Sequence, residues 1–490
     1  MEARLAEVLA ENVRLREENA ALRADVAGLE DRIAELEAER DQHSGTSSKP
    51  PSSDTTAQRA EQIARREQNA KSKGKRRARK PGKQPGAEGH SLSRVEPDET
   101  VVHSPPACGL CGDALNGAPI VARKVRQVLD LPPRRLVATD HVAEERRCPG
   151  CGTTTAAAFP AEATAPVCFG PGMRAAGLYL TGRQHLPVER AAEAMAQLLG
   201  APVSTGFLSG LWAEAGDRLE PFIDRLKAVL RQAPVLHADE TGARVSGKKR
   251  WFHTLSTATL TLVACHQLRG AQALLDIGVL PGHDGVVVHD GWKPYQKIDG
   301  PAHAQCGAHI LRHLEGVAVV WSQQPWAEEM ADLLRSAKKT AARAALAGHD
   351  RVHPAAAGRI RARYDRIITN ALSKLPNGPP PRKKNTGGWL WFHRKAWNLL
   401  IRLRDDKDDI LRFLTDTAVP FDNNQAERDL RMVKLQQKIS GTFRSEAGAR
   451  HFAHVRSYLQ TAAKQGINLL DALTRLFTTG PWLPPAATTP

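Results

Sequence analysis

Three acidic residues of this chain have the type and the setting of metal ligands. Asp239 lies in the apolar segment PVLHADETGARV, and Asp290 follows the apolar segment GVVVH and precedes a glycine. Glu427 falls in the first turn of a helix expected to begin within VPFDNNQAERDLR. Clustered carboxylates repel one another unless a cation neutralises them, and magnesium prefers a few carboxylates together with phosphate oxygens and water. We therefore expect these acids to hold two magnesium or manganese ions, roughly 4 Å apart, that act on a phosphodiester.

Each acid also has a simpler structural explanation. Asp239 could be a turn acid, Asp290 a helix N-cap, and Glu427 the partner of Asn424 in a capping box. These explanations do not account for two acids at the ends of strands in a basic protein. Basic residues follow Glu427 on the same face of the expected helix, or shortly beyond it, and would hold phosphates: Arg431, Lys434, Lys438 and Arg444.

Two C-x-x-C-G segments, CGLCG and CPGCG, are separated by 36 residues. This spacing predicts two tight turns that wrap one tetrahedral zinc ion, with four thiolate ligands: Cys108, Cys111, Cys148 and Cys151. A site without an open coordination position would be structural rather than catalytic. A redox pair or chance spacing is the alternative. Arg146 and Arg147 of this small β-rich ribbon could contact DNA.

Three cysteines remain outside these pairs. Cys306 and His309 form a C-x-x-H pair after an expected strand, but a second zinc would need further ligands that the sequence does not locate, so the pair is interpreted as supporting structure. Cys168 and Cys265 are expected to be buried small apolar residues. The odd total of seven, without a secretory leader, argues against a disulfide framework and for a reducing compartment.

Length and charge indicate a multidomain protein with a polyanionic partner. A chain of 490 residues is too long for one core, so three or four domains are expected. The formal net charge is +16; residues 1–41 contain 12 acidic and 6 basic residues, which leaves +22 on the remainder. Such a charge favours a nucleic acid. No apolar run approaches the roughly 20 residues of a membrane helix, so we expect a soluble, intracellular protein.

The elements that must position these residues begin with a coiled coil over 1–42. Val8, Leu15, Leu22, Leu29 and Leu36 recur every seven residues, which is typical of the d positions of a heptad repeat. Asparagine at two of the a positions favours a parallel dimer in fixed register. A lone amphipathic helix packed on its own domain is the alternative. A homodimer or higher oligomer is expected.

A flexible, basic linker is expected over 43–98. Its segment KSKGKRRARKPGK contains eight basic residues in thirteen. The run is interpreted as an arm along DNA phosphates, or as a solvated tail or localisation signal. The arm residues proposed to bind DNA are Arg76, Arg77, Arg79 and Lys80.

A zinc ribbon is expected over 99–165, followed by helices over 166–230. The segment LPVERAAEAMAQLLG ends at Gly200, and Ser204 caps the next helix, which is the outline of a helix-turn-helix. A plain packing hairpin fits the same pattern, so this alternative stays open.

Strands are expected from 234 onward, in an order that matches a ribonuclease-H-like sheet. The catalytic core is expected over 231–315 and 419–480, interrupted by an all-helical insertion over 316–418 and followed by a disordered tail over 481–490. Asp290 and Glu427 are 137 residues apart, far more than one crossover helix requires. The loop before Trp389 and Trp391 is basic and suits binding to DNA ends, although tryptophans in such a setting are more often core residues than base-stacking residues.

Four segments in this order, HADETGARV, GVVVHDGWKPY, CGAHILRHL and DNNQAERDLR, resemble the DDE transposases of the insertion sequence sixty-six family. The resemblance covers nearly the whole chain, including SSKPPSSD, KPGKQPG, the cysteine pairs and the C-terminal GTFRSEAGARHFAHVRSYL. It implies that Asp239, Asp290 and Glu427 form the DDE triad of a ribonuclease-H-like domain with a helical insertion.

The function that this implies is DNA transposition. The protein would bind the terminal inverted repeats of its element, hydrolyse a phosphodiester at each end, and use the freed 3′-hydroxyl to attack target DNA. Element ends, target DNA and accessory transposition proteins are the expected partners, with no membrane. The resemblance also implies a bacterial protein that is cytoplasmic and associated with the nucleoid. The alternatives are a non-enzymatic DNA-binding regulator with zipper and zinc ribbon, and a ribonuclease-H-type nuclease that cuts without joining.

Overall fold

The computed structural model describes residues 93–130, 136–160, 162–320, 325–374 and 388–485, with single residues before 93. The chain divides into two units: Ile63–Leu136, and Met1–Gln62 with Val137–Pro490. Most of the expected coiled coil, the four basic residues of the arm and the end of the tail lie outside the described residues. Those described between 11 and 26 are helical: Glu11, Arg14, Leu15, Glu17, Glu18, Asn19, Leu22, Asp25 and Val26.

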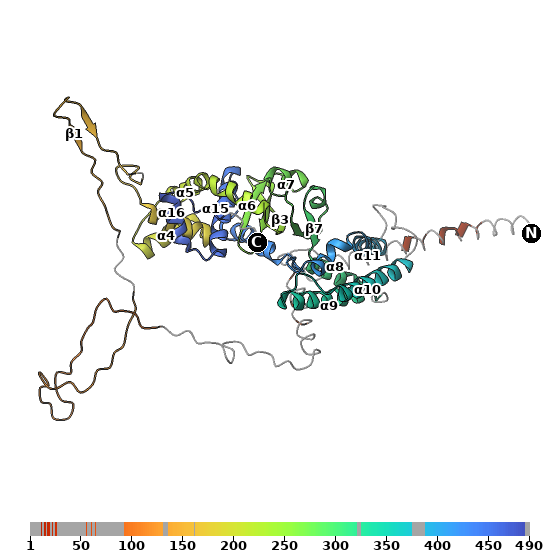
Figure 1. Cartoon of the computed structure of the whole chain (residues 1–490), viewed down its shortest axis with the longest axis horizontal. Helices are drawn as coiled ribbons and strands as arrows, with labels where there is room; N and C mark the ends of the chain where they lie inside the picture. The colour runs from red at the N-terminus through yellow and green to blue at the C-terminus, as the bar shows by residue number, and fades with distance from the viewer. Residues whose placement is uncertain are drawn as a thin grey trace, which may run out of the picture. The chain divides into compact units, whose positions relative to one another are not determined.

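A five-stranded mixed sheet forms the centre of the larger unit (Figure 1). Its strand order is β5-β4-β3-β6-β7, with β3, β4 and β5 antiparallel and β3, β6 and β7 parallel. The strands are β3 (Val235–Val245), β4 (Lys248–Ser256), β5 (Thr261–His266), β6 (Val286–His289) and β7 (Ala302–Gln305). All five lie after residue 234, where the sequence predicts strands.

Local sequence explains the hairpin between β3 and β4. Val245 pairs with Lys248, so the loop has two residues, Ser246 and Gly247, and both have positive φ, 47° and 74°. A two-residue loop with positive φ at both positions matches the right-handed twist of the flanking strands. The turn therefore fixes the register of β4 against β3.

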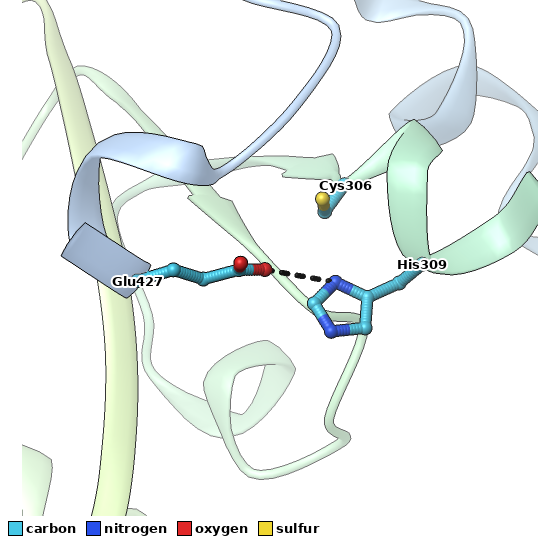
Figure 2. A group of neighbouring side chains, drawn as sticks. All are labelled: Cys306, His309 and Glu427. Carbon is cyan, nitrogen blue, oxygen red and sulfur yellow. Dashed lines mark ion pairs between the residues drawn. The ribbon is translucent and has the colours of Figure 1, made fainter. Parts of the chain in front are cut away.

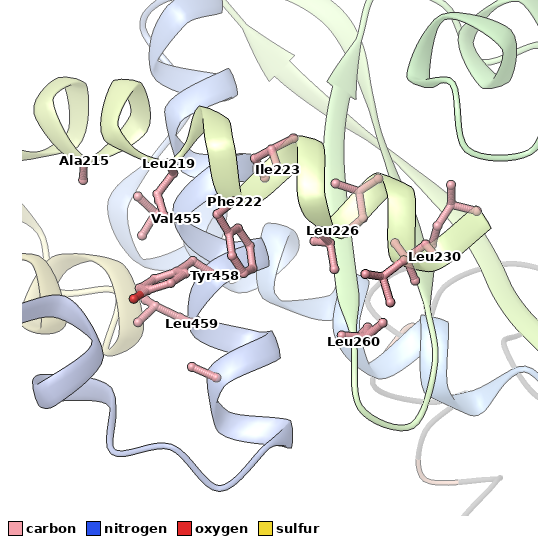
Figure 3. Packing of buried hydrophobic residues seen from close by; sticks show 14 of the residues in the cluster. Ala215, Leu219, Phe222, Ile223, Leu226, Leu230, Leu260, Val455, Tyr458 and Leu459 are labelled. Carbon is pink, nitrogen blue, oxygen red and sulfur yellow. The ribbon is translucent and has the colours of Figure 1, made fainter. Parts of the chain in front are cut away.

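Helices cover the two faces of β3 differently. Ala243 and Val245 pack in one apolar cluster with α14 (Asn424–Ser440) and α15 (Glu446–Lys464). Leu236 and Ala238, which alternate with them and so point to the other face, belong to the main core. In that core Phe222 of α6 (Glu220–Arg231) and Tyr458 of α15 meet edge to face at 5.0 Å (Figure 3).

The region expected to be helical before the sheet is helical. It contains α3 (Pro171–Leu178), a π-helical segment (Tyr179–Arg183), α4 (Val188–Leu199) and α5 (Thr205–Arg218). Gly200 ends α4 in the left-handed conformation, and Ser204 Oγ accepts a hydrogen bond from Phe207 N–H at 3.1 Å, as the sequence predicts. Leu208 and Leu211 of α5 are buried in the core. That α4 and α5 form a helix-turn-helix that binds DNA stays a prediction.

The expected insertion is also helical and has its own core. Helices α8, α9, α10 and α11 lie side by side (Figure 1), and their apolar side chains form one cluster. The elements are α8 (Gly307–Val320), α9 (Trp326–Leu346), α10 (Pro354–Ser373), α11 (Gly388–Asp405), α12 (Lys407–Ile410) and α13 (Arg412–Thr415). The cluster begins with Ile310 and Leu314 of α8, so the helical body starts earlier than expected. The side chains of Trp389 and Trp391 lie outside the described residues.

The remaining elements among the described residues are a short antiparallel hairpin, β1 (Glu145–Arg147) with β2 (Thr154–Ala156), the helices α7 (Ala271–Ile277) and α16 (Leu469–Thr478), and one turn of 3-10 helix (Tyr295–Lys297). In the part of the chain that the structure describes, no helix has the length and apolar character needed to span a bilayer.

Candidate active site

Asp239 lies in the middle of β3 rather than at a strand end, which corrects the expectation from the sequence. The pairing of β3 with its parallel neighbour β6 stops at His237 and Val288, whereas pairing with β4 continues to Val245. Two residues beyond the last parallel pair are Asp239 and Asp290. The side chain of Asp239 therefore lies where β6 has ended and the sheet opens toward its carboxyl edge.

Asp290 forms a tight turn immediately after β6. Its Oδ1 accepts a hydrogen bond from Trp292 N–H at 2.8 Å, which is a local capping interaction. Gly291 has φ of +85°, and the space that a side chain there would fill contains the guanidinium of Arg402. Arg402, from α11 of the insertion, donates to the Asp290 carbonyl at 2.6 Å and to Gln305 Oε1 at 2.7 Å. The insertion thus holds the Asp290 turn in place.

Glu427 lies in the first turn of α14, as expected, but it does not form the expected capping box. The N-cap is Asn423, one residue earlier than expected, and no side chain caps the helix there. Asn424 is exposed. The Glu427 side chain is 31% exposed and turns toward His309 of α8. Its position therefore serves a contact between elements rather than the helix end.

Asn423 is a residue that the sequence did not single out, and it connects α14 to the sheet. It is 1% exposed. Its Nδ2 donates to the Ala238 carbonyl at 2.7 Å, and its Oδ1 lies 2.9 Å from His237 Nδ1. Because Oδ1 can only accept, the imidazole must carry its proton on Nδ1. Its backbone N–H donates to Cys306 Sγ at 3.2 Å. One side chain therefore fixes Glu427's helix against β3.

The charges of the neighbouring acids act on Asp239. Burial raises the pKa of Asp239 well above its ordinary value, and the charges of Glu240, Asp290 and Glu427 raise it further. The backbone N–H of Glu240, which donates to Asp239 Oδ1 at 2.9 Å, opposes this shift. A buried carboxyl surrounded by other carboxyls gains most from a bound cation. Because all the donors are oxygens, the cluster suits a hard ion such as magnesium.

Glu240, the neighbour of Asp239, points to the opposite face of the sheet and has its own partners. Its side chain is 2% exposed, ion-paired to Arg269 at 2.8 Å, and accepts from Tyr295 Oη at 2.6 Å. Burial raises its pKa, with Asp290 adding to the shift and Tyr295 and Arg269 opposing it. Arg269 in turn stacks on the rings of Trp251 and Trp292, at 4.8 and 4.1 Å. Glu240 is therefore a structural acid that the pattern of residues alone could not separate from Asp239.

The basic residues that follow Glu427 are at the surface. Arg431, Lys434, Lys438 and Arg444 are exposed. Lys434 donates to the Gly242 carbonyl of β3, so its stem is held against the sheet while the other three side chains remain available to phosphates. Their role toward DNA stays a prediction.

Each cysteine pair forms a tight turn of its own. Gly112 N–H donates to the Cys108 carbonyl at 3.0 Å, and Gly152 N–H donates to the Cys148 carbonyl at 2.9 Å. Hydrogen bonds from the backbone of Cys111 and Leu110 lower the pKa of Cys108 to about 7, which favours the thiolate form. The two pairs belong to different units, so each turn is described by itself. One zinc held by all four stays a prediction.

The single cysteines differ from one another. Cys168, expected to be buried, is exposed in the irregular segment between β2 and α3, which corrects that expectation; Cys265 is half-buried. Cys306 is buried, and with His309 and Glu427 it forms a group whose ligand atoms lie within 4.8 Å of one another (Figure 2). From the sequence, Cys306 and His309 are interpreted as supporting structure, because the third member of the group, Glu427, lies in a helix far along the chain.

The fold defines a class: a mixed α/β protein with a five-stranded central sheet, in which Asp239 comes from β3, Asp290 from the turn after β6 and Glu427 from α14. Comparison with known proteins then gives the family. The model of the transposase IS66 family matches residues 166–451, more than half of the chain, and the chain belongs to that family. The zinc-finger binding domain of transposase IS66 matches residues 105–152, which include all four paired cysteines, and a family of unknown function matches residues 1–93.

A curated relative is similar along most of its length. It is the uncharacterized protein y4hP of Sinorhizobium fredii (strain NBRC 101917 / NGR234), 23% identical over 425 residues, which cover 78% of this chain and 72% of the relative. The protein is thus a transposase, and its zinc-finger region implies binding to DNA.

Proposed function

We propose that this transposase cuts and joins DNA through a DDE triad of Asp239, Asp290 and Glu427. The observation that carries the proposal is the Asp239 carboxyl, whose pKa is raised mainly by burial and further by the charges of Glu240, Asp290 and Glu427. A carboxyl that is desolvated and near other carboxylates lowers the stability of the metal-free protein. A requirement for divalent cations in the reaction explains why such an acid is present.

The strand order supports a ribonuclease-H-like catalytic domain. In that fold the central strand and its parallel neighbour present carboxylates side by side, and here the corresponding strands are β3 and β6. The third acid then comes from a later helix, α14, that packs on the same face as Asp239.

The residues present fit two magnesium or manganese ions. Asp239 and Asp290 would hold the ions and Glu427 would complete the site; when bound, the ions activate the attacking oxygen and stabilise the leaving 3′-oxygen. In the first reaction water displaces the 3′-oxygen of the element end. In the second, that 3′-hydroxyl displaces a 3′-oxygen of the target strand. Both are in-line displacements at phosphorus, so one site serves both.

The other parts of the chain would bring DNA to this site. Residues 1–42 would dimerise as a coiled coil and pair the element ends. The basic arm, the four-cysteine zinc ribbon and the exposed residues Arg431, Lys438 and Arg444 would hold phosphates. Lys434, which is hydrogen-bonded to β3, would add positive charge beside the DNA that these residues hold. Target DNA, accessory transposition proteins and a nucleoid location complete the proposal.

The test is cleavage of an element end in magnesium by Asp239→Asn, Asp290→Asn and Glu427→Gln. Each change keeps the shape of the side chain and removes its charge, so cleavage should fall at least about 1000-fold, several kcal/mol of transition-state stabilisation. Asp284→Asn, an exposed aspartate in the loop before β6, is the matched control and should cleave normally. Retained cleavage in the three variants would refute the triad.

Two rival functions give different results. A non-enzymatic regulator would show no cleavage in the parent protein, and the three variants would bind DNA unchanged. A nuclease that cuts without joining would cleave, but pre-cleaved ends supplied with magnesium would yield no joined product.

A further inference from the structure

A group of potential ligand atoms shares Glu427 with the proposed triad. Cys306 ends the loop after β7, His309 lies in the first turn of α8, and Glu427 lies in the first turn of α14. Figure 2 shows the Glu427 carboxylate pointing toward the His309 ring, with the Cys306 sulfur on the same side. We propose that Cys306, His309 and Glu427 form a mononuclear site for zinc.

The distances fit such a site. Zinc bonds of about 2.0–2.3 Å to nitrogen, oxygen and sulfur place the ligand atoms of a tetrahedral site roughly 3.3–3.8 Å apart. His309 Nδ1 and Glu427 Oε1 are 3.7 Å apart, and all three ligand atoms lie within 4.8 Å of one another. Small side-chain rotations therefore bring them around one ion.

Hydrogen bonding to the residues that the structure describes leaves one of the ligand atoms, His309 Nδ1, without a partner and supports another, Cys306 Sγ. His309 Nδ1 is buried and has no hydrogen-bond partner within the described residues, and 3.7 Å is too long for a bond to Glu427. Cys306 Sγ accepts from the backbone N–H of Asn423 at 3.2 Å. A metal-bound thiolate commonly has such a supporting donor, which orients the sulfur and stabilises its charge.

The donor set selects the metal. A thiolate and an imidazole favour zinc or a similarly soft divalent ion over magnesium, whereas the aspartates of the acid cluster favour the reverse. Burial raises the pKa of Cys306 to about 11 and lowers that of His309, so the imidazole is neutral and the thiol releases one proton when the ion binds.

Three protein ligands leave one coordination position open, which is typical of zinc that binds water or an oxygen ligand such as a phosphate. The ion would also fix Glu427 relative to α8. This inference does not depend on the proposed DDE chemistry, because the ligand atoms converge whether or not Glu427 takes part in strand cleavage.

The test is the zinc content of the full-length protein, purified from zinc-supplemented medium and dialysed against metal-free buffer. The double variant Cys306→Ser/His309→Gln should contain one zinc per chain fewer than the parent. Cys265→Ser, which removes a half-buried thiol outside the cluster, should keep the parent value. Because serine can still accept from Asn423, circular dichroism should show the parent fold. An unchanged zinc content in the double variant would overturn the site.

Cobalt binding separates this site from the cysteine pairs. In a variant with serine at all four paired cysteines, added cobalt should give a near-ultraviolet charge-transfer band from a single thiolate. Adding Cys306→Ser should abolish that band. The absence of any thiolate band in the four-serine variant, with its fold intact, would equally refute the proposal. Neither measurement uses DNA, so their outcome is independent of cleavage.

Discussion

Replacing Asn423 with alanine tests how the first turn of α14 is held against the sheet. The change removes the bond from Nδ2 to the Ala238 carbonyl, 2.7 Å, and the bond from His237 Nδ1 to Oδ1, 2.9 Å. The buried Ala238 carbonyl left unpaired costs about 1–3 kcal/mol, and loss of the bond to the half-buried His237 ring adds about 1 kcal/mol, so the change should cost roughly 2–4 kcal/mol. The backbone bond from residue 423 to Cys306 remains.

Amide hydrogen exchange across residues 424–440 measures this loss where it occurs. Opening of α14 should become about 30- to 700-fold more frequent, since about 1.4 kcal/mol corresponds to tenfold. Asn424→Ala is the control: Asn424 is adjacent, exposed and identical in type, and its replacement should change the free energy of opening by less than about 0.5 kcal/mol.

A second variant separates hydrogen bonding from volume. Asn423→Asp is nearly the same size and can still accept from His237, but it places a carboxylate oxygen against the Ala238 carbonyl. It should destabilise α14 at least as much as alanine does. If aspartate is tolerated, or if Asn424→Ala matches Asn423→Ala, then Asn423 does not hold the helix in the way described.

Three further changes have defined outcomes. Because the pKa of Asp239 is raised in the folded protein, its contribution to stability is present below the ordinary value of 3.8 and is lost as pH rises toward the raised pKa, by at most about 1.4 kcal/mol per pH unit. Thermal unfolding in chelator should therefore depend less on pH in Asp239→Asn than in the parent protein. An identical pH dependence would count against the shift. Lys464→Met leaves the buried carboxylate of Asp429, 2.7 Å away, without its cation and should lower stability to unfolding by about 3–5 kcal/mol, with recovery in the double variant carrying Asp429→Leu. Gly291→Ala meets both a positive φ and the Arg402 guanidinium, so end cleavage should fall more than in Gly282→Ala, where φ is also positive but space is open.

The sequence predicted the strands well because their signal is local. Alternation of apolar and polar residues marks β4 and β5, a continuous valine run marks β6, and each segment ends at turn residues. Alternation of apolar and polar residues does not show which other strands pair with a given strand along its length. The sequence therefore placed Asp239 at a strand end, whereas β3 continues beside β4 after β6 has stopped.

The candidate site was predictable only in part. The triad acids stand out through their settings along the chain, but the clamp by Asn423 and the contact of Arg402 with the Asp290 turn join residues 112 or more positions apart. The capping box failed because the N-cap lies one residue earlier than the pattern suggests, at Asn423, whose side chain bonds the sheet instead. Cys306 and His309 lacked a third ligand in the sequence for the same reason: Glu427 reaches them only through the folded core.

The helical insertion also controls when the acid cluster can exist. Synthesis proceeds from the N-terminus at about 5–20 residues per second, so the ribosome needs roughly 7–27 s to travel the 137 residues from Asp290 to Glu427. During that interval the nascent chain already carries the zinc-finger region and the first two acids, yet α14 has not been made. Any product of premature termination inside the insertion lacks Glu427. A product that stops before Arg402 also lacks the contact that holds the Asp290 turn. Incomplete chains are therefore expected to retain modules for contacting DNA without a complete site for cutting it.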